Sequence, residues 1–262
     1  MNINNVLTGK GGVGKTLAAT VLGCYFQERG QRIECFDVDS NQPSFSHYTS
    51  LGVRRMDVTR NGTVDLQLFD GALLRIYGPG AWSGAPRTDV DQVIIDSGSA
   101  SYLPFVDYMR TEEVLGHFET LGYRHTLHVV LAGGRALNDC LLSLEQLVAL
   151  FGEQSRIVVW LNDYFDALPW ADRDQFVASG AYRKYGHLIT GIVRMPDLRP
   201  ETEGRAFNLW SGKNCTFAEA LASSELVFTD GWRLMRIRDM YYDQLDLVFG
   251  TVAGSDLAVA SE

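Results

Sequence analysis

The sequence predicts an α/β fold of three layers, in which helices flank a mostly parallel central sheet. Short apolar runs of strand length alternate with longer runs whose apolar residues recur at helical spacing. The first strand, helix and strand fall within about 35 residues and enclose a glycine-rich loop. Such a βαβ unit requires a right-handed crossover between parallel strands, so we expect the rest of the sheet to extend it.

Length and composition fit a single globular domain. The chain has 262 residues, of which 46% are hydrophobic and 21% charged. The net charge of −9 argues against a surface that binds nucleic acid or anionic lipid throughout, although it allows a local basic patch. We expect one domain over residues 1–250 and a flexible tail over residues 251–262.

The cysteines and the hydropathy pattern predict a cytoplasmic protein. No C-x-x-C pair occurs and no apolar run approaches the length of a membrane span. The first strand begins at once, which leaves no room for a signal peptide. We expect reduced, buried thiols at Cys24, Cys35, Cys140 and Cys215.

The strands are predicted from short apolar runs, which are typical of buried parallel strands. They are expected at residues 3–7, 33–36, 93–96, 126–131, 156–161 and 188–193. The helices are predicted from apolar residues three and four apart. They are expected at residues 16–29, 64–76, 137–148, 170–177 and 232–249, with a further helical region ending near residue 122. Thr216 and Glu219 form a capping-box pattern before another helix. Residues 44–60 are not assigned, but could cover the sheet edge.

The glycine-rich loop has the pattern of a phosphate-binding loop. Residues 9–16 read Gly-Lys-Gly-Gly-Val-Gly-Lys-Thr and satisfy G-x-x-x-x-G-K-[ST]. Consecutive glycines let the backbone wrap around an anion with its N–H groups pointing inward. The following helix adds a favourable dipole. A nucleoside triphosphate therefore fits better than the alternative, a turn that only joins a strand to a helix.

Three side chains of this loop carry charge or metal chemistry. Lys15 is expected to reach the β- and γ-phosphates, and the Thr16 hydroxyl to take a position on Mg²⁺. Lys10 is not needed to cradle phosphate, and a cation there would add charge beside the γ-phosphate. The alternative for Lys10 is an ordinary solvated loop lysine.

The carboxyl ends of the predicted strands supply the remaining candidates, because ligands of open α/β sheets bind at that edge. Asp96 closes an apolar strand and is expected to hold Mg²⁺, and the alternative is a carboxylate that caps the next helix or loop. Asp39 could polarise the attacking water or touch the metal, whereas Asp37 could equally be a turn-forming acid. Asn162 could hydrogen-bond the adenine. Met195-Pro196 could pack against the base, although a proline that only ends the strand is equally expected. The expected nucleotide contacts are Gly9, Lys10, Gly11, Gly12, Val13, Gly14, Lys15, Thr16, Leu17, Asn162 and Pro196.

Residues 10–16, taken with Asp37, Asp39, Asp96 and Asn162, resemble the deviant Walker A ATPases related to MinD and ParA. The resemblance implies a P-loop NTPase fold and a two-fold dimer with ATP held between the subunits. It implies that Lys10 reaches the phosphates of the partner and that hydrolysis separates the subunits. Lys10, Lys15 and Asp39 would then be catalytic, and Thr16, Asp39 and Asp96 would hold Mg²⁺.

A second resemblance covers about residues 4–249. Residues 96–104, 158–162, 201–207 and 216–221 are similar to nucleotide-binding proteins encoded in plasmid conjugal-transfer regions. It implies conjugation or relaxosome-associated partners. Three features depart from MinD and ParA. Asp39 is followed by Ser40 and not by the usual proline. Ser97-Gly98-Ser99 replaces a proline-rich switch II, and the final residues carry no basic residue that would resemble the membrane anchor of MinD.

The leading hypothesis is therefore an ATP-dependent dimerisation switch with slow ATPase activity. One alternative is a small-molecule ATP-dependent ligase or kinase on the same fold, and another is a non-catalytic nucleotide-binding adaptor.

Two groups of arginines raise the question of whether the protein binds DNA. The ordinary alternative is a solvated helix face, which the negative net charge favours. The groups are Arg233, Arg236 and Arg238 with Trp232, Tyr241 and Tyr242 near the C-terminus, and Arg54 with Arg55.

Overall fold

The computed structural model describes residues 1–250 apart from 61–62, 82–83, 165–167 and 171–172. A seven-stranded sheet has the order β3-β2-β6-β1-β7-β8-β9. Its strands are β1 (Asn2–Leu7), β2 (Ile33–Asp37), β3 (Arg54–Arg55), β6 (Gln92–Asp96), β7 (Arg124–Ala132), β8 (Arg156–Asn162) and β9 (Ile189–Met195). Neighbouring strands of this sheet pair in parallel, as predicted. The flexible tail predicted for residues 251–262 lies outside the described residues.

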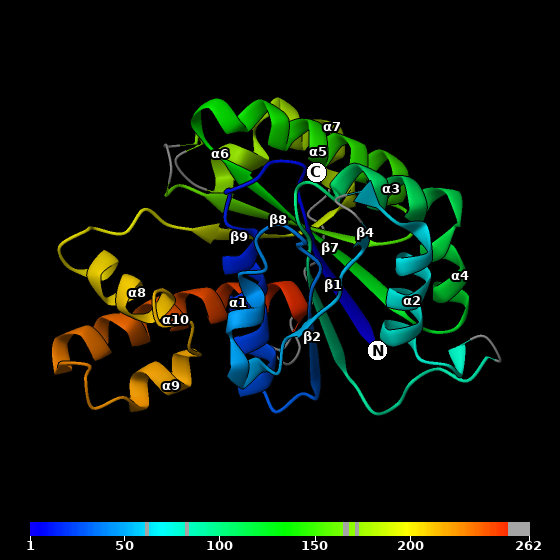
Figure 1. Cartoon of the computed structure of the whole chain (residues 1–262). Coiled ribbons are helices and arrows are strands. Elements are labelled where there is room, and N and C mark those ends of the chain that lie inside the picture. The colour runs from blue at the N-terminus through cyan, green and yellow to red at the C-terminus, as the bar shows by residue number, and fades with distance from the viewer. Residues whose placement is uncertain (61–62, 82–83, 165–167, 171–172, 251–262) are drawn as a thin grey trace.

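Helices cover both faces of the sheet, so the predicted three-layer α/β fold is confirmed. Figure 1 shows α1 and α10 on one face and α3, α4 and α5 on the other. The main helices are α1 (Lys15–Glu28), α2 (Leu66–Tyr77), α3 (Tyr102–Thr111), α4 (Val114–Thr120), α5 (Leu137–Phe151) and α10 (Phe228–Phe249). Shorter helices are α6 (Arg173–Val177), α7 (Gly180–Tyr185), α8 (Glu203–Ser211) and α9 (Phe217–Ala222).

The structure adds to or divides some of the predicted elements and confirms one predicted helix cap. The unassigned stretch 44–60 contributes β3, which pairs with β2 at the sheet edge, and β4 (Thr59–Arg60), which pairs antiparallel with β5 (Thr63–Val64). The helical region ending near residue 122 is two helices, because Glu113 has a left-handed backbone with φ 48°. Helices α7 and α8 were not predicted, because their sequences show no strong helical spacing of apolar residues. The capping box of Thr216 and Glu219 is confirmed at the start of α9.

The cysteines are free, as expected, although Cys215 is half-buried rather than buried. Among the described helices, none is both long and apolar enough to cross a membrane.

A chain of buried polar side chains crosses the sheet from β8 to β6. Trp160 donates its indole N–H to His128 Nδ1 at 3.0 Å, and His128 Nε2 lies 3.3 Å from Asn4 Oδ1. Asn4 Nδ2 in turn donates to Gln92 Oε1 at 2.9 Å. Because an indole nitrogen can only donate, His128 is the neutral tautomer that carries its proton on Nε2. Burial lowers the pKa of His128 to about 3.

This network predicts a pH-dependent stability. The unfolded chain takes up a proton at His128 below pH ~6.5, whereas the native protein does so only near its lowered pKa. The contribution of His128 is therefore complete at neutral pH and is lost as the pH falls through this window. Between pH 7 and pH 5 we expect a loss of about 2 kcal/mol from His128. Urea unfolding at pH 7 and pH 5 measures this loss of unfolding free energy. The loss should be about 2 kcal/mol smaller in His128→Gln than in wild type. Equal losses in the two proteins would contradict the lowered pKa of His128.

Candidate nucleotide-binding site

The strand register brings the predicted site residues to one edge of the sheet. Asp96 at the end of β6 is paired with Val6 of β1 on one side and with Asp37 of β2 on the other. Farther along the same edge, Asn162 of β8 is paired with Met195 of β9. The loop of residues 8–14 leaves β1 between these groups and enters α1 at Lys15. The expectation that the carboxyl ends converge is therefore confirmed.

Gly14 is held in a conformation and a space that suit only glycine. Its φ is +100°, and an added Cβ would lie 2.7 Å from Asn162 Nδ2. Asn162 fixes this part of the loop because its Nδ2 donates to the Val13 carbonyl oxygen at 2.8 Å. The Asn162 side chain and the Gly14 backbone together fix the shape of this part of the loop.

Substitution of Gly14 should damage both the fold and the site. Gly14→Ala is expected to cost about 1–3 kcal/mol of unfolding free energy, because of the strained backbone and the contact with Asn162. ATP affinity should fall about tenfold or more if part of that strain deforms the loop. Gly71→Ala is the matched control, since an added Cβ in α2 meets nothing within 4 Å. Urea unfolding and nucleotide titration test both variants, and equal stability of Gly14→Ala and wild type would contradict this view.

Lys15 is buried and folded back onto its own loop. Its Nζ donates to the Lys10 carbonyl oxygen at 2.8 Å. Burial lowers the pKa of the Lys15 ammonium, and the carboxylates of Asp96 and Asp39 act against that shift. A buried ammonium with one carbonyl partner retains donors for phosphate oxygens.

Thr16 and Asp96 meet at the start of α1. The Thr16 hydroxyl donates to Asp96 Oδ2 at 2.6 Å, while the buried Asp96 Oδ1 has no hydrogen-bond partner among the described residues. Burial raises the pKa of the Asp96 carboxyl to about 7, and the Thr16 hydrogen bond opposes this. A cation at Oδ1 would favour the carboxylate form.

These residues fit a magnesium-bound nucleotide. Mg²⁺ is usually held by one or two protein oxygens together with phosphate oxygens and water. Among the described residues, no group of three or more His, Cys, Asp or Glu side chains could hold a metal. Thr16 and Asp96 would supply the protein oxygens, and the glycine backbone would supply N–H donors to the phosphates.

The two acids after β2 shape their own loop. Both oxygens of the buried Asp37 accept backbone N–H groups, from Asp39 at 3.0 Å and from Ser46 at 2.8 Å. This favours the turn-forming role for Asp37. Asp39 Oδ1 accepts from the N–H groups of Asn41 and Gln42. Its catalytic and metal roles remain predictions.

The remaining predicted contacts lie around the same loop. Asn162 is buried, and its Oδ1 accepts the N–H of Tyr164. Contact of Asn162 with adenine therefore remains a prediction. Pro196 is half-buried directly after β9, and Leu17 is half-buried in α1.

Lys10 forms an ion pair within its own chain. Its Nζ lies 2.9 Å from Asp139 Oδ2, and both side chains are about half exposed, at 42% and 54%. Helix α5 also places Ser143, whose hydroxyl accepts the Gly9 N–H at 3.1 Å. The sequence did not identify Asp139 and Ser143 as site residues, because helical periodicity does not show which groups the polar face of a helix contacts.

The loop after Asp96 packs on both neighbouring loops. An added Cβ at Gly98 would lie 2.7 Å from Asp39 Cγ, and one at Gly11 would lie 3.1 Å from Ser99 Oγ. The ring of Tyr102, at the start of α3, lies 3.1 Å from where a Gly9 Cβ would be. The Ser-Gly-Ser loop therefore touches the phosphate loop despite lacking proline.

Most residues proposed as a DNA-binding face have structural partners. Arg233 pairs with the buried Asp230 at 2.9 Å, and Arg238 pairs with Asp239 at 2.7 Å. Tyr241 and Tyr242 are buried. The exposed remainder is Trp232 with Arg236 over its ring. At the sheet edge, Arg54 pairs with Glu34, and Arg55 donates to the Ser40 carbonyl oxygen.

A parallel sheet with a glycine-rich loop between β1 and α1 defines a P-loop nucleotide-binding protein. The CbiA family, described as the CobQ/CobB/MinD/ParA nucleotide binding domain, matches residues 5–223, and the chain belongs to this family. Two Escherichia coli proteins named "Protein TraL" are each 31% identical over 244 residues, which is 93% of this chain and 97% of theirs. The fold is shared with the MinD cell division protein of Aquifex aeolicus, with a TM-score of 0.50 and 13% identity over 98% of each chain.

Proposed function

We propose that this protein is an ATP-binding, weakly ATP-hydrolysing dimerisation switch of the MinD/ParA type that acts in plasmid conjugal transfer. The observation that carries the proposal is the convergence of Lys15, Thr16 and Asp96 around one phosphate loop, where Asp96 Oδ1 has no partner in the part of the chain that the structure describes. ATP with Mg²⁺ is the cofactor. The similarity to Protein TraL supports conjugation or relaxosome-associated partners. The cytoplasm is the proposed location.

The roles of the side chains follow from their chemistry. Lys15 binds the β- and γ-phosphates, and Thr16 with Asp96 holds the metal directly or through water. Asp39 lies beside the Ser-Gly-Ser loop and positions the attacking water. Because this loop touches both Asp39 and Gly11, loss of the γ-phosphate changes contacts that continue into α3.

Light scattering with matched nucleotides tests the switch. We expect a dimer mass with Mg²⁺ and ATP, a monomer mass with Mg²⁺ and ADP, and slow phosphate release that returns the dimer to monomers. A chain that stays monomeric with ATP bound and unchanged over hours would instead be a passive nucleotide-binding adaptor. Phosphate release that depends on an added carboxylate metabolite would indicate a ligase or kinase.

A further inference from the structure

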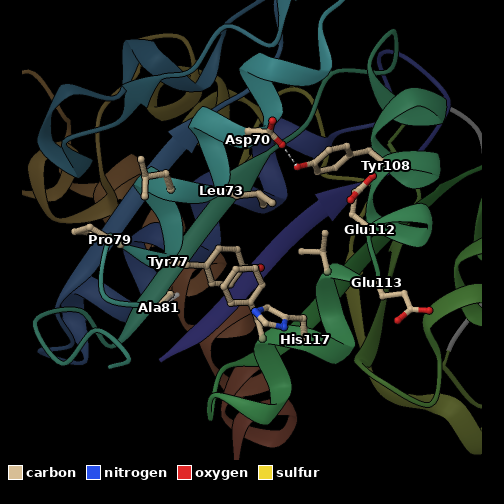
Figure 2. A pocket seen from close by; sticks show the side chains of 13 residues that line it. Asp70, Leu73, Tyr77, Pro79, Ala81, Tyr108, Glu112, Glu113 and His117 are labelled. Carbon is tan, nitrogen blue, oxygen red and sulfur yellow. Dashed lines mark hydrogen bonds between the residues drawn. The ribbon is translucent and has the colours of Figure 1, made fainter. Parts of the chain in front are cut away.

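A groove of about 720 Å³ lies between α2 and the α3–α4 pair, and the phosphate loop contributes none of its lining. Figure 2 shows Tyr77, Leu73 and His117 around its apolar part, with Asp70 and Tyr108 at one end. Tyr77 stacks on Phe118, with ring centroids 3.4 Å apart and planes inclined by 5°. Leu74, which is 58% exposed, adds apolar surface on the α2 side.

One edge of the groove is acidic. Glu112 and Glu113 are exposed on the α3–α4 side, where the left-handed backbone of Glu113 ends α3 and begins α4. Asp70 is exposed on α2 and accepts the Tyr108 hydroxyl at 2.6 Å. Among the described lining residues none is lysine or arginine. Arg110, close by in the chain, is paired with Asp107 at 2.8 Å.

The acidic edge and the apolar floor of the groove indicate which class of ligand it can bind. Carboxylates at the edge disfavour nucleotides, phosphates and nucleic acid, because like charges repel. The α2 side, from Asp70 to Tyr77, is about 10 Å long, which matches two turns of a helix. An apolar floor of this length between two helices suits the apolar face of an amphipathic helix.

We propose that this groove binds an amphipathic helix of a partner protein, with its apolar face on Leu73, Leu74 and Tyr77 and its lysine or arginine side chains facing Asp70, Glu112 and Glu113. No lining residue belongs to the phosphate loop, so the helix and the nucleotide would occupy different sites.

A synthetic peptide tests the proposal on the full chain without nucleotide. The probe is a fluorescein-labelled helix with leucines three and four positions apart and lysine or arginine elsewhere, measured by fluorescence anisotropy. A scrambled peptide of the same composition keeps the charge but loses the apolar face. Lys15→Ala protein serves as a second host, so that failure of nucleotide binding and failure of groove binding are distinguishable.

Two pairs of variants locate the binding site. Glu112→Lys with Glu113→Lys should weaken binding about tenfold or more, whereas Glu153→Lys with Glu201→Lys, which changes the net charge equally at other exposed sites, should not. Leu74→Asn should weaken it about fivefold. Its control is Leu142→Asn on α5, a site with 63% exposure. The proposal is overturned if groove variants bind as tightly as their controls, or if the scrambled peptide binds as well as the amphipathic one.

Discussion

Replacement of Lys15 by alanine is expected to reduce ATP affinity at least about 100-fold, because charge-assisted hydrogen bonds to phosphate are worth about 1.5–3 kcal/mol each. The Lys15 ammonium is buried and donates a hydrogen bond to the Lys10 carbonyl oxygen. Burial lowers its pKa, so the protein carries an ion in an unfavourable environment that a phosphate would improve.

Stability and affinity should therefore respond differently to Lys15→Ala. Removal of a desolvated charge is expected to leave the unfolding free energy of the nucleotide-free protein unchanged or slightly higher. Isothermal titration with Mg²⁺ and ATP measures the affinity, and urea unfolding without nucleotide measures the stability. Lys184→Ala removes an equal charge at a site with 61% exposure and is the control. A variant that binds ATP normally would remove Lys15 from the site, and one that unfolds would show a structural role instead.

The sheet and the position of the site could be predicted from the sequence, because buried parallel strands leave strong local signals. The run of residues 93–96 identified a central strand, and the glycine pattern identified the phosphate loop. Parallel strands place their carboxyl ends together, so Asp96 and Asn162 were expected at the loop without knowledge of distances. Thr16 and Asp96 are hydrogen-bonded, as this reasoning requires.

The contacts between layers could not be predicted in this way. Ser143 accepts the Gly9 N–H, and Tyr102 packs on the same glycine, but both lie on helices whose rotation about their axes depends on tertiary packing. The break at Glu113 was also invisible, because a left-handed backbone is expected of glycine and not of glutamate. Glu113 also lines the groove between α2 and the α3–α4 pair, so this surface depends in part on a backbone conformation that is unfavourable for glutamate.

Replacement of Lys10 by alanine is expected to leave ATP binding within about threefold of wild type and to abolish the ATP-dependent dimer. An exposed ion pair contributes only ~0–1 kcal/mol, so release of Lys10 from Asp139 costs little. A desolvated contact between an ammonium and phosphate oxygens across a subunit interface is stronger, because water no longer screens it. The pairing with Asp139 in the single chain is therefore compatible with transfer of Lys10 to a partner.

Asp139→Asn separates the two roles of this pair. If Asp139 holds Lys10 back, its neutral variant should dimerise with ATP up to about fivefold more tightly than wild type, which is the full value of an exposed pair. If the pair instead fixes the loop for binding, Asp139→Asn and Lys10→Ala should both weaken ATP affinity, and neither should dimerise better. Sedimentation equilibrium with Mg²⁺ and a non-hydrolysable ATP analogue measures dimerisation without interference from hydrolysis. A Lys10→Ala protein that dimerises like wild type would show that dimerisation does not depend on this lysine.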